Sequence, residues 1–188
     1  VPSREQDGVG GGGGEPGEGD RVEGAQARSV HGWTTGGLGA SHQDRGRAAE
    51  AIVREFGGSR ECTGEMSTVR VREDYRPILQ ALSEPGRNRV LVVDGGGSVT
   101  RAILGEKLLG TAQRNGWAGV IVNGAVRDTA LTTLIPIGLR ALGTIPQRGE
   151  SGAHSARDEP VVFAGVTFTP GGRLWADVDG IIVADGEL

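Results

Sequence analysis

Two unbroken apolar runs mark the middle of the chain and predict buried strands. Residues 90–93 read Val-Leu-Val-Val, and residues 119–123 read Gly-Val-Ile-Val-Asn. Runs without polar alternation are typical of strands that are covered on both faces. Between them, residues 99–115 have helical spacing with an interruption at Gly105, where a fresh helix can begin. We therefore expect a strand, a helical crossover and a second strand in one sheet.

Patterns on either side of this unit extend the sheet and add covering helices. Residues 48–56 and 75–82 predict helices, and residues 67–71 predict a strand because they alternate and end in β-branched side chains. Short apolar segments separated by turns predict antiparallel strands near the carboxyl end, at residues 160–163, 166–168 and 181–183. The expected fold is α/β, with a mixed sheet, covering helices and a β-rich C-terminal part.

Glycine is concentrated at the amino end of the chain. Of 35 glycines, 14 fall in residues 1–46, including an unbroken run from Gly10 to Gly14. Few apolar side chains are available there to offset the entropy of ordering the backbone, about 1–2 kcal/mol per residue. We expect residues 1–46 to be a disordered tail and residues 47–188 to form one domain.

Charge and cysteine content narrow the class of protein. The chain has 20 basic and 24 acidic residues, a net charge of −4, and no basic cluster, so direct nucleic-acid binding is disfavoured. It has no apolar run long enough to span a membrane. The single cysteine, Cys62, cannot form an internal disulfide. We expect a soluble, cytoplasmic protein without membrane or nucleic-acid contacts.

Polar residues follow both buried strands, where ligands of such sheets usually bind. Asp94 and three glycines follow the first strand, and Arg127 and Asp128 follow the second. A guanidinium beside a carboxylate offers an anion-binding fork and a ligand for a hard metal. A helix starting at Gly105 would add backbone amides that face an anion. These features form a candidate carboxylate and metal site.

Each of these features also has a structural interpretation that the pattern leaves open. Arg127 and Asp128 can be a surface ion pair, and the glycines after Asp94 can form a tight turn. Lys107, the only lysine, can be a solvated helix residue. By pattern alone the structural interpretations are the more common ones.

Several separated motifs occur in order and resemble the RraA-like family. They are VLVVDGGGS at residues 90–98, NGWAGVIV at 115–122 followed by GAVRD at 124–128, IGLRALG at 137–143, GVTF at 165–168 and DVDGIIV at 177–183. The resemblance implies a ββα swivelling-type domain that assembles as a homotrimer with active sites between subunits. Family members have a helix before their Phe-Gly-Gly element, whereas this chain has glycine-rich sequence there.

The resemblance also implies an activity. The family includes class II 4-hydroxy-4-methyl-2-oxoglutarate aldolases, which cleave this small 2-oxo acid to two pyruvates. They also decarboxylate oxaloacetate as a side activity, and both reactions depend on Mg²⁺ or Mn²⁺. Other members are named as regulators of ribonuclease E activity. A non-catalytic regulator that binds a ribonuclease is therefore the alternative function.

The family's functional residues fall on matching positions of this chain. The resemblance implies that Asp128 anchors the metal, largely through waters, and that Arg127 contacts the keto acid end of the substrate. The family's Gly-Asp-Asn-Leu stretch, whose backbone amides bind the substrate carboxylate, falls on Gly105, Glu106, Lys107 and Leu108. Glu106 and Lys107 depart from the usual Asp and Asn.

Two other reaction classes are weaker alternatives. A Schiff-base aldolase would use Lys107 as its nucleophile. S-adenosylmethionine-dependent methylation is the least favoured, because the glycine run after Val93 lacks the G-x-G-x-G spacing.

Overall fold

A computed structural model describes residues 32–150, 152 and 154–188. Its strands are β1 (Arg47–Ala48), β2 (Arg54–Glu55), β3 (Cys62–Arg70), β4 (Val90–Asp94), β5 (Ala102–Leu104), β6 (Gly119–Val126), β7 (Gly138–Thr144), β8 (Ala156–Arg157), β9 (Val161–Phe163), β10 (Val166–Phe168), β11 (Arg173–Asp177) and β12 (Gly180–Ala184). The helices in this part of the chain are α1 (Thr35–Ser41), α2 (Arg76–Ser83), α3 (Glu106–Arg114) and α4 (Thr129–Thr132).

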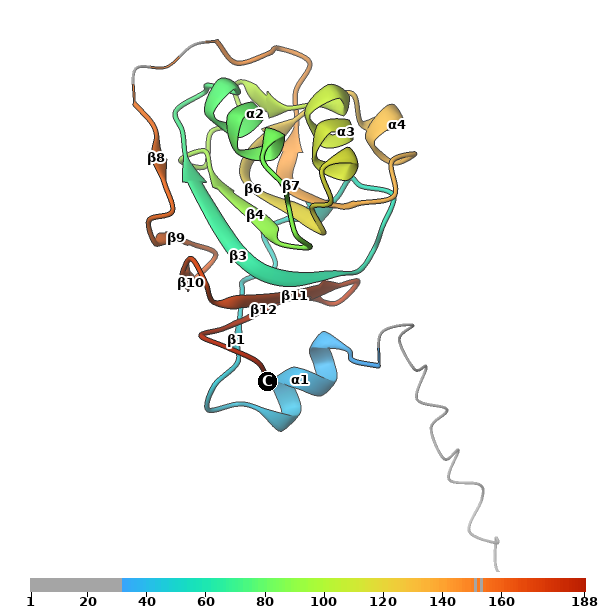
Figure 1. Ribbon diagram of the computed structural model, residues 1–188, viewed down its shortest axis with the longest axis vertical. Coiled ribbons are helices and arrows are strands. Elements are labelled where there is room, and N and C mark those ends of the chain that lie inside the picture. The colour runs from blue at the N-terminus through green and yellow to red at the C-terminus, as the bar shows by residue number, and fades with distance from the viewer. Residues whose placement is uncertain (1–31, 151, 153) are drawn as a thin grey trace, which may run out of the picture.

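One mixed sheet carries ten of these strands, in the order β1-β12-β11-β3-β4-β6-β7-β2, with β5 beside β6 and β8 beside β3 (Figure 1). Strands β3, β4, β6 and β7 are parallel, whereas β11, β12, β1 and β2 join antiparallel. Strands β9 and β10 form a separate antiparallel pair. The expected α/β class, mixed sheet and β-rich C-terminal part are confirmed.

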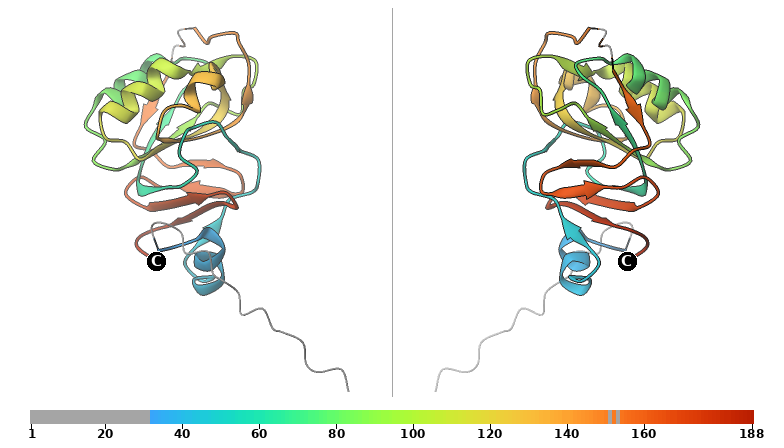
Figure 2. Two further views of the ribbon diagram at one scale, coloured as in Figure 1. Left: turned by 90° about the vertical axis from the view of Figure 1, so that its right-hand side faces the viewer. Right: turned by 90° about the vertical axis from the view of Figure 1, so that its left-hand side faces the viewer.

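Both faces of the parallel strands are buried, as the apolar runs predict. On β4, Leu91 and Val93 belong to the core under α2 and α3. Val90 and Val92 face the opposite core, which includes Phe163 and other side chains of β9–β12. Figures 1 and 2 show α2, α3 and α4 over one face and α1 beyond β11 and β12. No helix of the described residues is long and apolar enough to cross a bilayer.

The helix expected at residues 48–56 is not formed. β1 pairs with β12 at one edge of the sheet, and β2 pairs with β7 at the other. Ala49 and Val53 still pack on the core, so their helix-like spacing reflects burial along an extended chain. Backbone hydrogen bonds to the two sheet edges replace those that a helix would have made.

The interruption at Gly105 separates a strand from a helix, whereas the pattern predicts helical structure on both sides of it. The helix expected from residue 99 begins only at Glu106, immediately after Gly105, as α3. The residues before it form β5, whose three side chains are all buried and which pairs with β6. Burial on the sheet therefore overrides the helical spacing of residues 99–104.

Ordered structure starts earlier than the expected boundary at residue 47. Residues 1–31 of the expected tail lie outside the described residues, but α1 forms at Thr35–Ser41. Thr34 caps this helix by accepting from the Gly37 amide at 3.0 Å. Thr35 donates to the Asp177 carboxylate through its amide at 2.7 Å and its hydroxyl at 2.5 Å. These tertiary contacts compensate for the poor helix propensity of a glycine-rich segment.

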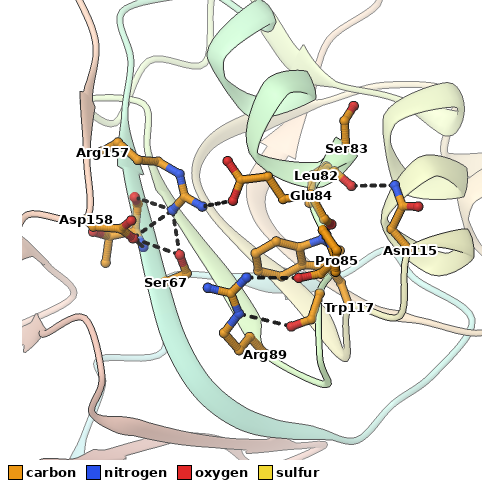
Figure 3. Close-up of polar contacts among 12 residues, drawn as sticks. Ser67, Leu82, Ser83, Glu84, Pro85, Arg89, Asn115, Trp117, Arg157 and Asp158 are labelled. Atoms are coloured by element: carbon orange, nitrogen blue, oxygen red, sulfur yellow. Dashed lines mark hydrogen bonds and ion pairs between the residues drawn. The ribbon is translucent and has the colours of Figure 1, made fainter.

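A group of polar contacts fastens β8 to the rest of the domain (Figure 3). Arg157 forms ion pairs with Asp158 at 2.7 Å and with Glu84, after α2, at 3.2 Å. Its Nη1 also donates to the Ser67 hydroxyl on β3. Below it, the Trp117 indole donates to the Glu84 carbonyl at 3.1 Å. β8 is thereby fixed to both β3 and the end of α2.

Candidate functional site

The candidate site begins where β6 ends, beside the junction of β5 and α3. All eight residues of β6 are buried, so the first side chains able to leave the core are Arg127 and Asp128. The Arg127 amide donates to the Leu104 carbonyl at 3.0 Å, which keeps it against the last residue of β5. The sheet thus delivers the sequence-predicted pair to the start of α3.

Asp128 has an unusual backbone conformation that directs its side chain. It precedes α4 with φ 58° and ψ 36°, and its carboxylate makes no capping hydrogen bond to that helix. Aspartate is one of the few side chains that tolerate this left-handed conformation. The carboxylate lies instead against Gly105. It is therefore available to a ligand rather than used for helix capping.

Gly105 allows this close approach because it has no Cβ. A Cβ at this position would lie 2.7 Å from Asp128 Oδ2 and 3.2 Å from Arg127 Cγ. Gly105 is also the residue that precedes α3, and Leu109 is the first helical residue whose amide bonds back, to the Gly105 carbonyl at 3.1 Å. The preceding amides of Glu106, Lys107 and Leu108 are those that a helix start leaves unpaired.

A cavity of about 300 Å³ lies at this junction. All six sequence-predicted residues line it, together with side chains from α2, from β5 and from the segment after β7. The lining residues are Tyr75, Leu79, Ala102, Ile103, Leu104, Gly105, Glu106, Lys107, Leu108, Thr111, Arg127, Asp128 and Arg148.

Arg127 and Asp128 are neither turned apart nor buried against each other. Arg127 Nε lies 3.4 Å from Asp128 Oδ2, and the side chains are 36% and 41% exposed. They form a half-exposed ion pair with the cavity beside it. A negatively charged ligand there would meet the guanidinium and the amides of α3, both of which favour an anion.

The polar loop after β4 does not join this site. It lines a different cavity of about 500 Å³, with Arg70 and Glu73. The amides of Gly95 and Gly97 donate to the Asn123 carbonyl, and those of Gly96 and Ser98 donate to Asp94 Oδ1 and the Gly95 carbonyl. Because all four amides are used within the loop and its neighbour, the tight-turn interpretation of the three glycines holds.

Comparison with known proteins adds to this geometry. A family model described as Aldolase/RraA matches residues 38–183. The chain belongs to the Aldolase/RraA family. The matched region begins within α1, in agreement with the early start of ordered structure.

Two curated relatives in this family are provisionally named 4-hydroxy-4-methyl-2-oxoglutarate aldolases. The one from Alkalilimnicola ehrlichii is 46% identical and covers 77% of this chain and 90% of its own. The one from Laribacter hongkongensis is 45% identical over 71% of this chain and 84% of its own. The names of these relatives support an aldolase.

Two solved structures of similar identity carry other names. The RNA-processing inhibitor RraA from Thermus thermophilis has a TM-score of 0.80 at 38% identity, covering 83% of this chain and 94% of its own. A structure of a protein from Geobacillus kaustophilus, named S-adenosylmethionine:2-dimethylmenaquinone methyltransferase, has a TM-score of 0.79 at 39% identity. The match covers 83% of this chain and 97% of that protein's chain. The Aldolase/RraA fold therefore accompanies several assigned functions.

The divalent cation that the family resemblance implies can be compared with the donor groups present. Among the described residues, no three His, Cys, Asp or Glu side chains are grouped so as to hold a metal. The cavity does contain two carboxylates, Glu106 and Asp128. Mg²⁺ commonly uses one or two carboxylates and retains several waters. The residues present therefore fit a hydrated hard cation held at Asp128, but not an ion that needs a full set of protein ligands.

Among the lining residues that the sequence did not indicate are Tyr75 and Arg148. The spacing of residues 75–82 predicts a helix and gives Tyr75 no role in a site, and the sequence around Arg148 predicts no helix or strand. They reach the cavity through the packing of α2 and of the segment after β7, which are distant in sequence from Arg127. No local pattern near either residue indicated a site.

Proposed function

We propose that this protein is a divalent-metal-dependent aldolase that cleaves 4-hydroxy-4-methyl-2-oxoglutarate to two pyruvates and also decarboxylates oxaloacetate. One observation carries the proposal: Arg127 and Asp128 lie 3.4 Å apart beside the start of α3 and line one cavity. The names of relatives at 44–46% identity support the same activity.

The α3 end of the cavity suits the 2-oxo acid part of the substrate. The amides of Glu106, Lys107 and Leu108 can bind the C1 carboxylate, because the start of a helix favours an anion. Backbone amides do this whatever the side chains are, so Glu106 and Lys107 can replace the usual Asp and Asn. Arg127 then contacts the C2 oxygen through its guanidinium.

Cleavage breaks the C3–C4 bond after the C4 hydroxyl loses its proton. The C4 fragment leaves as pyruvate, and the bonding electrons pass to the other fragment as an enolate whose charge rests on the C2 oxygen. Arg127 stabilises this charge more in the transition state than in the substrate, which is what accelerates the reaction. A divalent cation held at Asp128 would supply Lewis acidity that also stabilises the negative charge on the enolate oxygen. Loss of CO₂ from oxaloacetate creates the same enolate, so one site can serve both reactions.

A pyruvate-release assay on both substrates, with Mg²⁺ and with EDTA, tests the proposal. We expect turnover with Mg²⁺, none with EDTA, and loss of turnover by a factor of about 100 or more in Asp128→Asn. A matched control is Asp185→Asn, since Asp185 pairs with Arg47 at 2.9 Å and is 80% exposed. Turnover that is unchanged in EDTA or in Asp128→Asn would rule out the metal-dependent mechanism.

A second candidate function is regulation of a ribonuclease by binding it. It is favoured by the similarity to the RNA-processing inhibitor RraA, at 38% identity and a TM-score of 0.80. A purified protein that binds ribonuclease E but releases no pyruvate with Mg²⁺ would support this function over the aldolase. Strong turnover without any partner would exclude binding as its sole role.

We also propose a homotrimer, as the family resemblance implies. Leu131 and Leu134, which follow Asp128 closely in the chain, are 51% and 76% exposed. Exposed leucines next to a candidate site are suited to contact with another subunit. Light scattering should give about 58 kDa, three times the 19.4 kDa of one chain. A mass near that of a single chain would refute the trimer.

A further inference from the structure

Three cationic side chains line the cavity, whereas its two carboxylates, Glu106 and Asp128, both belong to the α3 end. Arg127 and Lys107 lie at the α3 end, and a third cation, Arg148, lines the cavity from the segment after β7. Arg148 forms no ion pair with a carboxylate in residues 32–150, 152 and 154–188. The cavity thus has a cation without a protein counter-ion, away from the group that would bind the 2-oxo acid.

Contacts with β5 fix the backbone around Arg148. The Ala102 amide donates to the Gln147 carbonyl at 2.8 Å, and the Gly149 amide donates to the Ala102 carbonyl at 2.8 Å. Gly149 is also packed tightly, since a Cβ there would lie 2.3 Å from the Glu73 carbonyl oxygen. Further along the chain, Arg157 ties β8 to β3 and to Glu84, the residue after α2 (Figure 3). Arg148 is therefore carried by anchored backbone at both ends.

The Arg148 side chain is also held in place. Its guanidinium lies over the Tyr75 ring, 5.2 Å from the ring centroid. A guanidinium stacked on an aromatic face keeps its N–H groups free at the edge for a carboxylate. Tyr75 and Arg148 together form a pre-ordered cationic wall of the cavity.

β5 holds the backbone of both the Arg127 segment and the Arg148 segment. The Arg127 amide is bound to Leu104, whereas the Arg148 segment is bound to Ala102. Two residues of extended strand separate these anchors by about 7 Å. An extended chain of five carbons spans about 5 Å between its terminal carbons, given C–C bonds of about 1.5 Å. A five-carbon 2-oxo dicarboxylate therefore carries its second carboxylate about 5 Å from the first, whereas pyruvate has no second carboxylate.

We propose that Arg148, stacked on Tyr75, binds the remote carboxylate of the substrate and makes the cavity selective for 2-oxo dicarboxylates. This assignment rests on the proposed function for the orientation of the substrate, with its 2-oxo acid at Arg127 and α3. Arg148 is a specificity-determining residue in this scheme, and the bond-breaking step itself does not need it.

Calorimetry with 2-oxoglutarate and pyruvate tests the assignment without turnover. Both are 2-oxo acids, but only 2-oxoglutarate has a carboxylate at the fifth carbon, and it has no C4 hydroxyl to permit cleavage. With Mg²⁺ present, the unmodified protein should bind 2-oxoglutarate more tightly than pyruvate. Arg148→Gln should weaken 2-oxoglutarate binding about tenfold or more and leave pyruvate within twofold. Arg148→Lys should retain part of the preference, because it keeps the charge.

Arg114→Gln is the matched control, because this substitution also removes one positive charge. Arg114 lies in the last turn of α3, and its side chain donates to the Thr111 hydroxyl at 3.2 Å. The substitution should change neither affinity. Equal weakening of both ligands in Arg148→Gln, or no weakening of 2-oxoglutarate, would overturn the assignment.

Catalytic readouts separate this assignment from the proposed function. In D₂O, exchange of the pyruvate methyl protons needs the enolate-stabilising end of the site but no remote carboxylate. Arg148→Gln should keep this exchange while KM for 4-hydroxy-4-methyl-2-oxoglutarate rises about tenfold. A protein that releases no pyruvate yet keeps an Arg148-dependent preference for 2-oxoglutarate would refute the aldolase and retain this binding site. An active aldolase whose preference for 2-oxoglutarate over pyruvate is unchanged in Arg148→Gln would support the proposed function and refute the role of Arg148.

Discussion

Replacing Gly105 with alanine should damage the site while leaving the fold intact. The new Cβ would lie 2.7 Å from Asp128 Oδ2, where ordinary contact begins at 3.4 Å, so the carboxylate must retreat by about 0.7 Å. The backbone itself is not strained, because φ −141° and ψ −168° suit any residue. The carboxylate is the flexible end of a half-exposed side chain, so its movement relieves the clash.

The expected magnitudes follow from this displacement. Losing a glycine before a helix to alanine costs about 1 kcal/mol or less, which lowers Tm by about 2–4 °C in a chain of this size. A misplacement of about 1 Å at a reacting centre can reduce the rate about a hundredfold. We therefore expect Gly105→Ala to lower kcat for pyruvate release about tenfold or more, with only a small change in Tm.

Gly110→Ala provides the control for this prediction. Gly110 lies within the same helix, and a Cβ there meets only the Arg114 side chain, at 3.2 Å. It should raise stability slightly, because alanine favours a helix interior, and keep turnover. Turnover of Gly105→Ala equal to that of the unmodified protein would refute the reasoning that the Asp128 position matters. Global unfolding of Gly105→Ala would refute the claim that the carboxylate can yield.

Three further predictions concern other groups. Burial opposes ionisation of Asp177, but hydrogen bonds from the Thr35 hydroxyl and amide outweigh it and hold the Asp177 pKa below its usual value. The contact should therefore stabilise α1 fully above the usual carboxyl pKa and be lost as the pH falls through the lowered pKa of Asp177. Its loss should appear as a red shift of tryptophan fluorescence, which Asp177→Asn should show already at neutral pH. Burial raises the pKa of Cys62 to about 11, so the folded protein should react with a thiol reagent at pH 8 far more slowly than the urea-unfolded protein, and equal rates would contradict its burial. Borohydride with pyruvate should leave Lys107 unlabelled if the proposed metal-dependent mechanism operates, whereas a covalent adduct seen by mass spectrometry would favour a Schiff base.

The parts of the fold that the sequence predicts well are those with a strong local cause. Residues 90–93 and 119–123 form β4 and β6, because strands covered on both faces need apolar side chains at every position. The apolar residues of 48–56 are equally visible in the sequence, but pairing with β12 and β7 decides their conformation. Ala48, for example, pairs with Ile182, which lies 134 residues further along the chain, so no local window contains both.

The residues of the candidate site likewise include some that the sequence indicates and some that only the folded structure brings to the cavity. Gly105, Arg127 and Asp128 come from the ends of a crossover unit, and topology alone brings such ends together. Tyr75, the residue before α2, and Arg148, in the segment after β7, complete the cavity. Their roles depend on side-chain packing across the sheet edge, which neither composition nor spacing specifies.

The segment that carries β1 and β2 has a consequence for how the protein behaves while it is being made. Its two short strands occupy both terminal positions of the main strand order, and one of their partners is β12, at Gly180–Ala184. On the ribosome, β11 and β1 remain without their β12 neighbour until residues 180–184 emerge, which leaves strand edges open to pairing with other chains. Removing residues 180–184 should therefore lower solubility more than the loss of five residues suggests.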